Sequence, residues 1–266
     1  MIYVVPSLKA KEKLQCEGKA WAESQGFTYV PRGKRTIQDL MDEYGEDFLV
    51  YSSRGPQIDR PEGSHFFSLN MAELRIQNLR KGQRDHLLEA LMGRGSSKLP
   101  ITVLDCTCGF GADAAVASFG LPTGSRVDAL EVSPLLEAVT SWGFSHFVHK
   151  KDDVTAALRR ISLRRGDYRD YLLSDEGPVY DVLYFDPMFQ RPVEASCQFQ
   201  PVRASMEHGG LTRDLIERAL QKARRRVVIK ERDFRQLCRD FPEVTLYGGK
   251  YSRIGYAVLE CDSWKK

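Results

Sequence analysis

The feature that most constrains the fold is a short apolar run that ends in an acid and breaks at once into a glycine-rich turn. Residues 101–104, Ile-Thr-Val-Leu, have the length and the β-branched residues of a buried strand. Asp105 follows, then Gly109-Phe-Gly111, and then an Ala- and Val-rich segment over 112–119 that is typical of a buried helix. Glycine at a strand-to-helix turn lets a ligand approach the backbone closely. The pattern therefore predicts a nucleotide-binding α/β sheet.

Composition is that of an ordinary globular protein. With 266 residues, 42% apolar and 28% charged, the chain can form one large α/β domain and a smaller unit. The net charge of +3 does not by itself indicate a polyanionic partner. Runs such as Arg224-Arg225-Arg226 are more often solvated faces than ligand sites.

Cysteine spacing and hydropathy argue against a disulfide-rich protein, a zinc-binding protein and a membrane-spanning protein. The six cysteines stand at irregular intervals, as reduced thiols do, and Cys106-Thr-Cys108 is too tight for the usual zinc pair. No apolar stretch has membrane length, and the N-terminus lacks the apolar segment of a signal peptide. We therefore expect a cytoplasmic protein with no metal site and no membrane partner, and the oligomeric state stays open.

The first part of the chain predicts a small α/β unit over residues 1–63. β-prone runs and helix-forming segments alternate along it, at 2–5, 8–25, 27–30, 37–44 and 48–52. Thr36 stands where it could cap the second helix. Connecting helices are expected over 64–98.

Those connecting helices have two possible roles. Packing against the main sheet is the simpler one. However, Arg75, Lys81 and Arg84 would lie near the cofactor strand and could meet phosphates.

Residues 99–266 alternate strand and helix signals, as a doubly wound sheet does. The expected strands are 101–104, 126–131, 161–163, 180–185, 227–229, 244–247 and 255–259. The last two have no helix between them. They predict an antiparallel hairpin at the end of a mostly parallel sheet.

Two cofactor classes use a glycine turn of this kind, and the acids beside it discriminate between them. Gly109-Phe-Gly-Ala-Asp-Ala114, followed about twenty residues later by Glu131 as a ribose-binding acid, would suit a dinucleotide. A dinucleotide, however, places its pyrophosphate at the helix N-terminus, where Asp105 and Asp113 would oppose it. S-adenosylmethionine carries no phosphate and brings a sulfonium and an ammonium cation. We therefore expect S-adenosylmethionine, with a plain turn or cap aspartate as the alternative for Asp105.

A second motif, Asp186-Pro-Met-Phe189, stands at the carboxyl end of the strand over 180–185, the edge where open α/β sheets bind ligands. The Asp186 carboxylate and a backbone carbonyl at Pro187 would accept the two N–H bonds of an exocyclic amine as its nitrogen pyramidalises. Phe189 could stack on the base. The alternative is an Asp-Pro turn with a core Phe.

Taken together, these segments resemble the bacterial small-subunit rRNA guanine-N2 methyltransferase family (RsmJ-like). The resemblance covers about residues 99–260 and rests on segments in the family's order: 103–114, Leu130-Glu131, Asp186-Pro-Met-Phe189, 228–234 and 249–256. It implies a Rossmann-like class I methyltransferase sheet and S-adenosylmethionine as methyl donor. It also implies the N2 amine of a guanine in small-subunit rRNA as methyl acceptor.

The resemblance implies roles for the matching residues. Catalytic positions would be Asp186, Pro187 and Phe189. Cofactor-binding positions would be Asp105, Thr107, Gly109, Gly111, Ala112 and Asp113 near the methionine end, Glu131 and Val132 at the ribose, Asp167 and Tyr168 at the adenine, and Asp186.

The substrate contacts are predicted to include Met188 and Phe189 of the same motif, together with the cations Arg75, Lys230 and Arg232. Lys230 and Arg232 are the candidates for phosphate contacts, with solvation or internal pairing as the alternative. Two other functions stay open. The protein could methylate another RNA base, a protein amide or a small molecule, or it could bind a nucleotide without chemistry.

Overall fold

The structure is a computed structural model that describes residues 1–93, 99–187, 210–248 and 254–261. These residues form two compact units, each with its own sheet. The first unit contains residues 1–68 and 133–147. The second contains the described residues of 69–132, 148–192 and 208–266. The domain boundaries expected at residues 63 and 98 stay predictions.

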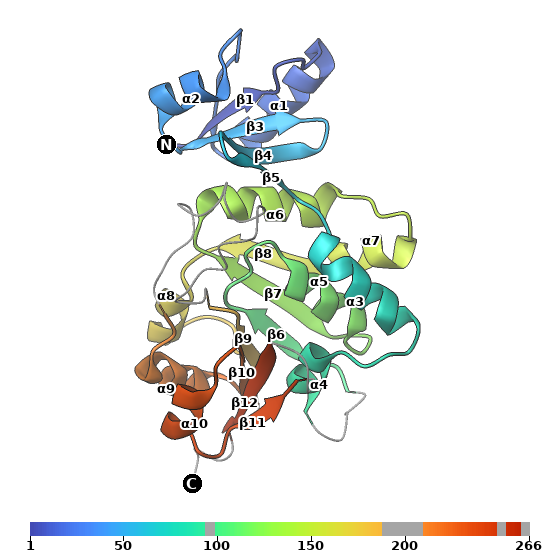
Figure 1. Cartoon of the computed structure of the whole chain (residues 1–266), viewed down its shortest axis with the longest axis vertical. Coiled ribbons are helices and arrows are strands. Elements are labelled where there is room, and N and C mark those ends of the chain that lie inside the picture. The colour runs from blue at the N-terminus through green and yellow to red at the C-terminus, as the bar shows by residue number, and fades with distance from the viewer. Residues whose placement is uncertain (94–98, 188–209, 249–253, 262–266) are drawn as a thin grey trace. The chain divides into compact units, whose positions relative to one another are not determined.

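The first unit is built on a five-stranded sheet in the order β2-β1-β3-β4-β5 (Figure 1). Its elements are β1 (Tyr3–Pro6), α1 (Glu12–Ser24), β2 (Thr28–Tyr29), α2 (Ile37–Tyr44), β3 (Phe48–Ser52), β4 (Gly55–Arg60), β5 (Gly63–Phe66) and α6 (Pro134–His146). β1 pairs in parallel with β2 and β3, and Thr36 caps α2 in a capping box with Asp39. The predicted alternation of strand and helix is therefore confirmed here.

The antiparallel strands β4 and β5 were not predicted from the sequence. Every residue of β4 is buried, although Gln57, Asp59 and Arg60 are polar. Gln57 Nε2 donates to both carboxylate oxygens of Asp59, at 2.7 and 2.8 Å. The Arg60 guanidinium donates to the carbonyls of Asp59 at 2.8 Å and Glu46 at 2.6 Å. These polar groups can be buried because they form hydrogen bonds within the protein. As a result, β4 lacks the alternation of apolar and polar residues from which a strand is predicted.

The second unit contains a seven-stranded sheet in the order β11-β12-β10-β9-β6-β7-β8. Its strands are β6 (Thr102–Asp105), β7 (Arg126–Glu131), β8 (Ile161–Arg165), β9 (Val182–Phe185), β10 (Arg226–Glu231), β11 (Thr245–Tyr247) and β12 (Gly255–Glu260). Neighbouring strands are parallel except at β12, which is antiparallel to both β10 and β11. This confirms the mostly parallel sheet with an antiparallel C-terminal hairpin.

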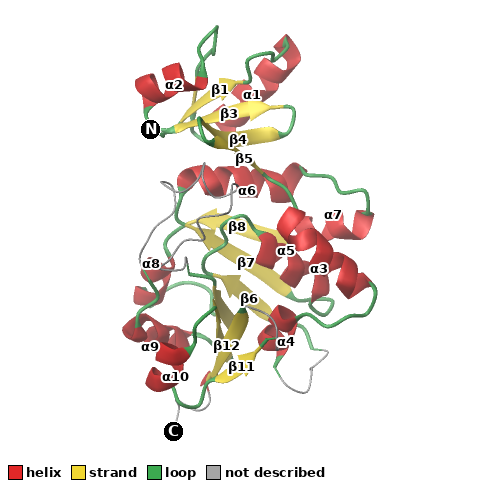
Figure 2. Ribbon diagram, viewed as in Figure 1, coloured by secondary structure: helices red, strands yellow, loops and turns green. Residues whose placement is uncertain are grey.

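Helices cover both faces of this sheet, as Figure 2 shows. One face carries α8 (Tyr168–Leu173), α9 (Arg213–Lys222) and α10 (Arg235–Asp240), and the other carries α3 (Asn70–Arg80), α4 (His86–Met92), α5 (Ala112–Gly120) and α7 (Asp152–Arg159). Leu183, Phe185 and Ile229 pack into the apolar core beneath α8 and α9. Since side chains alternate along a strand, Tyr184 and Lys230 face the opposite side, toward α5. Of these helices, α8 was not predicted.

Candidate active site

The candidate site lies at the carboxyl edge of the seven-stranded sheet, the edge at which open α/β sheets bind ligands. Asp105 ends β6, Glu131 ends the neighbouring β7, and Asp186 follows β9 on the other side of β6. In the β6–β9 pair, Asp105 lies opposite Tyr184, two residues before Asp186. The structure therefore brings these three acids, each singled out in the sequence, to one edge.

The glycine turn between β6 and α5 has the backbone that close ligand approach requires. Gly109 and Gly111 have φ values of 55° and 74°, in the left-handed region that favours glycine. A Cβ added at Gly109 would have Thr107 O as its nearest neighbour, at 3.9 Å, so the space above the turn is open. Gly111 precedes α5, which begins at Ala112.

A buried carboxylate fastens this turn to β7. The Gly109 N–H donates to Oε2 of Glu131 at 2.8 Å, and the Cys108 N–H donates to Leu130 O at 2.9 Å. Glu131 is only 8% exposed, while Val132 beside it is 38% exposed. A carboxylate at the end of the second strand of such a unit is the acceptor that ribose hydroxyls need. The position fits the ribose of the expected cofactor.

Asp105 and Thr107 link the turn to the Asp-Pro motif. The Thr107 N–H donates to Asp105 Oδ1 at 3.1 Å, and Thr107 Oγ1 accepts a hydrogen bond from the Asp186 N–H at 2.7 Å. Burial raises the pKa of Asp105 well above its usual range, and the nearby carboxylates of Asp113 and Asp186 raise it further. Such a carboxyl group is stabilised in its ionised form by a cation. A cofactor with ammonium and sulfonium groups therefore fits this acidic site, whereas a pyrophosphate does not.

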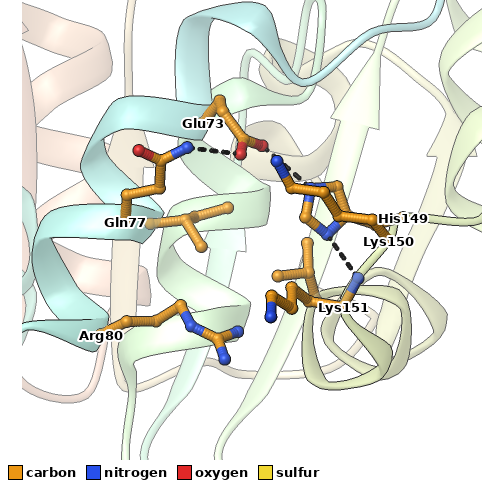
Figure 3. A pocket seen from close by; sticks show the side chains of 8 residues that line it. Glu73, Gln77, Arg80, His149, Lys150 and Lys151 are labelled. Carbon is orange, nitrogen blue, oxygen red and sulfur yellow. Dashed lines mark hydrogen bonds and ion pairs between the residues drawn. The ribbon is translucent and has the colours of Figure 1, made fainter.

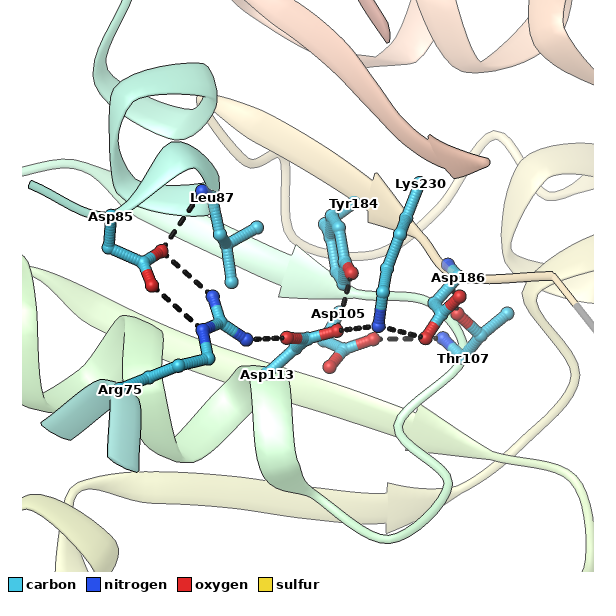
Figure 4. A network of polar contacts seen from close by, with 9 residues as sticks. All are labelled: Arg75, Asp85, Leu87, Asp105, Thr107, Asp113, Tyr184, Asp186 and Lys230. Atoms are coloured by element: carbon cyan, nitrogen blue, oxygen red, sulfur yellow. Dashed lines mark hydrogen bonds and ion pairs between the residues drawn. The ribbon is translucent and has the colours of Figure 1, made fainter. Parts of the chain in front are cut away.

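Behind the turn, Lys230 and Arg75 form a network of ion pairs with carboxylates (Figure 4). Lys230 Nζ lies 2.7 Å from Oδ2 of Asp113 and 2.7 Å from Oδ2 of Asp186. Arg75 contacts Asp113 from the other side and donates to both oxygens of Asp85, at 2.7 and 2.8 Å. The network thus joins α3, α4, α5, β9 and β10.

Charge and burial compete at the two carboxylates that Lys230 joins. Burial opposes ionisation of Asp113, but Lys230 and Arg75 outweigh it and lower its pKa. At Asp186 burial dominates, so the pKa is raised to about 6 although Lys230 acts to lower it. The Lys230 ammonium is buried too, yet the two carboxylates hold its pKa above the usual value.

The adenine-side candidates lie at the start of α8, after β8. Asp167 caps this helix, because its Oδ1 accepts a hydrogen bond from the Arg169 N–H at 2.7 Å. Tyr168 is buried, and the Arg169 guanidinium carbon lies 5.2 Å from the centroid of its ring.

The residues predicted to contact the substrate have different surroundings in the structure. Arg75 and Lys230 pair with carboxylates of the chain itself. For Lys230 this is the internal pairing that the sequence left open. Arg232 follows β10, and its N–H donates to Glu231 Oε2 at 2.8 Å. Met188 and Phe189 lie outside the described residues. The phosphate and stacking roles therefore stay predictions, as does a direct cofactor contact for Asp113.

Two members of the network, Asp85 and Tyr184, were not identified from the sequence. Asp85 is the N-cap of α4, and it accepts from the Leu87 N–H at 3.0 Å as well as from Arg75. Tyr184 donates its hydroxyl proton to Asp113 Oδ2 at 2.7 Å. The strand period of two, which puts Tyr184 and Asp186 on one face, was the available signal for Tyr184.

A hollow of about 190 Å³ lies between α3 and the start of α7, apart from the candidate site (Figure 3). It is lined by Glu73, Ile76, Gln77, Arg80, His149, Lys150, Lys151 and Val154. Its polar groups largely contact one another: His149 Nε2 lies 3.1 Å from Glu73 Oε2, and Gln77 Nε2 donates to Glu73 at 2.7 Å. The hollow contains none of the cofactor or substrate residues expected from the sequence.

Among the helices of the described residues, none combines the length and the hydropathy needed to cross a bilayer. The same residues form no cluster of three or more His, Cys, Asp or Glu side chains that could hold a metal ion.

Two kinds of similarity place the protein among known ones. It is 29% identical over 230 residues to the uncharacterized protein YpiP of Bacillus subtilis, covering 86% of this chain and 88% of that protein. It is 28% identical over 194 residues to the ribosomal RNA small subunit methyltransferase J of Marinobacter nauticus, covering 72% of this chain and 66% of the relative. The crystal structure of the SAM-dependent methyltransferase NGO1261 from Neisseria gonorrhoeae superposes with a TM-score of 0.62, covering 97% of this chain and 95% of that one. At 18% identity, this likeness shows the fold alone, which is Rossmann-like.

The match to a family model shows to which protein family the chain belongs. The family described as "Putative SAM-dependent methyltransferase" matches residues 64–254, which include the glycine turn, Glu131 and Asp186. The acids of the site fit a cationic cofactor, as shown above. The chain therefore belongs to this family of S-adenosylmethionine-dependent methyltransferases, and S-adenosylmethionine is its methyl donor.

Proposed function

We propose that the enzyme methylates the exocyclic N2 amine of a guanine in small-subunit rRNA. The observation that carries this proposal is the placement of Asp186-Pro187 directly after β9, with the Asp186 N–H tied to Thr107 in the cofactor turn. An Asp-Pro pair there offers acceptors for an exocyclic amine. The relative named ribosomal RNA small subunit methyltransferase J supports RNA as the substrate. An rRNA acceptor would place the enzyme in the cytoplasm.

The cofactor residues divide by the part of the molecule that they would hold. When bound, S-adenosylmethionine supplies a methyl group attached to an electrophilic sulfonium. In our proposal Glu131 and Val132 hold the ribose, and Asp167 and Tyr168 flank the adenine. The methionine end would be held by the turn, with Asp105, Thr107, Gly109, Gly111, Ala112 and Asp113.

Alignment and hydrogen-bond acceptance would carry the catalysis. Asp186 and the Pro187 carbonyl would accept the two N–H bonds of the amine, which frees its lone pair from conjugation with the base. Holding the amine in line with the methyl group converts a bimolecular reaction into an effectively unimolecular one. As the bond from nitrogen to the methyl group forms, the bond from sulfur to that methyl group would break, and S-adenosylhomocysteine would be the leaving group. No strong base is needed, because the methylated nitrogen is acidic and loses its proton to water.

The deciding experiment uses labelled S-adenosylmethionine and two substrates from a strain that lacks the enzyme: small ribosomal subunits and naked small-subunit rRNA. We expect label in one defined guanine, and the stronger of the two substrates shows whether assembled subunit or free RNA is recognised. Label in another base, a protein or a small molecule would assign the methyltransferase a different acceptor. No label in any RNA would contradict the rRNA proposal. Binding of S-adenosylhomocysteine without any transfer would instead indicate a non-catalytic binding protein.

A further inference from the structure

We propose that Lys230 is a positioning residue that orients the Asp186 carboxylate, and that Asp113 holds Lys230 in place for this task. The inference rests on the proposed function, because it assigns Asp186 to the methyl-transfer site. It replaces the phosphate contact that the sequence had suggested for Lys230.

The strand register places the lysine beside its carboxylate. Ile229 of β10 lies opposite Phe185 of β9, so Lys230, the next residue of β10, comes beside Asp186, the first residue after β9. Their side chains meet at 2.7 Å, and Asp113 of α5 accepts a second bond from Lys230 Nζ at 2.7 Å. The Lys230 side chain is 13% exposed. With two of its three N–H bonds given to carboxylates of the chain, it is poorly placed to reach an RNA phosphate.

The same contacts define how Asp186 is held. Its N–H is anchored to Thr107 Oγ1, and its Oδ2 is anchored to Lys230. A carboxylate tied through the backbone and one oxygen presents its other oxygen in a defined direction, which is the preorganisation that an amine acceptor needs.

Charge balance gives Lys230 a second effect on Asp186. The titratable and charged groups around this carboxylate are Asp105 on β6, Asp113 on α5, Glu231 and Lys230 on β10, Tyr184 on β9, Tyr256 on β12 and Arg75 on α3. Asp113 and Glu231 raise the pKa of Asp186, while Lys230 lowers it. Without Lys230, the pKa of Asp186 would therefore rise further, and the carboxylate would lose its charge nearer to neutral pH.

The test compares Lys230→Met, Lys230→Arg, Asp186→Asn and the double variant Asp186→Asn/Lys230→Met with the wild type. Lys150→Met, an exposed lysine outside the site, is the matched control. Methyl transfer to small ribosomal subunits is measured for kcat, KM, pH profile and salt dependence, and binding of S-adenosylhomocysteine checks the fold. We expect Lys230→Met to lower kcat roughly 10- to 100-fold with KM nearly unchanged, and to move the acid limb of the profile to higher pH. Lys230→Arg should restore part of kcat.

The double variant asks whether Lys230 acts through Asp186. If it does, adding Lys230→Met to Asp186→Asn should lower kcat no further, because the two residues work as one unit. A phosphate contact would behave differently: Lys230→Met would raise KM, leave kcat and the pH profile unchanged, and reduce the salt slope by about 1. That result, or additive losses in the double variant, would overturn the inference.

Two further measurements keep the test decisive. If Lys230→Met does not fold, Asp113→Asn loosens the lysine from its other side, and unchanged kcat in that variant would refute the positioning role. If the wild type methylates no RNA, the proposed function fails by itself. The carboxyl resonance of Asp186 in a ¹³C titration then tests Lys230, whose replacement should raise the midpoint; an unmoved midpoint would reject the inference.

Discussion

The Asp186 N–H donates a hydrogen bond to Thr107 Oγ1 at 2.7 Å, so the turn after β6 and the end of β9 are fastened to each other. The first of these segments belongs to the cofactor turn, and the second begins the Asp-Pro motif. The Thr107 hydroxyl therefore fixes the position of the cofactor turn relative to the Asp-Pro motif. This arrangement leads directly to a first prediction.

Thr107→Val should misplace Asp186 without removing it. The substitution keeps the side-chain shape but leaves the Asp186 N–H without its acceptor, which should lower the free energy of unfolding by roughly 1–2 kcal/mol. We expect kcat to fall as well. Urea denaturation and methyl-transfer assays measure the two effects, and Thr107→Ser, which keeps the hydroxyl, serves as the control. Wild-type stability and activity in Thr107→Val would refute the link.

Replacing Asp186 by Asn or Ala should abolish or strongly reduce methyl transfer. Loss of a preorganised group that stabilises the transition state typically lowers kcat 10²–10³-fold, roughly. Binding of S-adenosylhomocysteine, measured by calorimetry, should change little. Asp233→Asn is the matched control, because Asp233 lies on the surface in a pair with Arg235. Substantial activity in Asp186→Ala would remove Asp186 from the mechanism.

The rate should depend on pH through the same carboxylate. Burial raises the pKa of Asp186 to about 6, so acid converts an acceptor into a protonated carboxyl group within reach of ordinary assays. We expect kcat to fall about tenfold for each pH unit below 6. The effect on stability has the opposite sign. The folded state binds this proton more tightly than the unfolded state, so the contribution of Asp186 to the free energy of unfolding decreases as pH rises from about 4 to 6.

The pH dependence is checked by kcat profiles between about pH 5 and 8 for the wild type and Asp186→Asn. The acid limb should be missing from the residual activity of the variant. An identical limb in both proteins would assign it to another group.

Glu131→Gln should separate cofactor recognition from fastening of the turn. The amide oxygen of Gln can still accept the hydrogen bond from the Gly109 N–H, whereas the charge is lost. We expect S-adenosylhomocysteine to bind roughly 10-fold more weakly, because hydrogen bonds to a charged group exceed those to a neutral one. The Tm should stay close to that of the wild type. Unchanged affinity with a lowered Tm would mean that Glu131 only holds the turn.

Two tyrosines near β9 form a matched pair for testing the network. Tyr180 donates its hydroxyl proton to Asp128 at 2.6 Å, and Tyr184 donates to Asp113 at 2.7 Å. Replacement of either by Phe should lower the free energy of unfolding by roughly 1–2 kcal/mol. Only Tyr184→Phe should also lower kcat, because only its partner holds Lys230. Equal kcat values in the two variants would show that the network is purely structural.

Local signals in the sequence predicted much of the fold. Thr36 does cap α2, and the terminal strands β11 and β12 do form an antiparallel hairpin. In contrast, β4 and α8 were missed. The strand β4 carries buried polar residues, and α8 is a short helix capped by Asp167, a residue that the sequence had assigned to the ligand.

The residues of the candidate site were also predicted only in part from the sequence. Gly109, Glu131 and Asp186 could be singled out because each ends or follows a strand that is visible in the sequence. The partners of Lys230 could not, since Asp113 and Asp186 lie 117 and 44 residues away from it along the chain. Separations of this size are bridged only when β6, β9 and β10 take their places in the sheet.

The sequence by itself determined the class of fold, the glycine turn and the acids that favour S-adenosylmethionine, because strand length, caps and positive φ values are properties of short segments. Only the tertiary structure decided what the charged side chains do. Strand order brought Lys230 between Asp113 and Asp186, and burial then turned a residue that could have met phosphate into an internal ion pair. Charge is visible in a sequence, whereas its partners and its solvation are set by the fold.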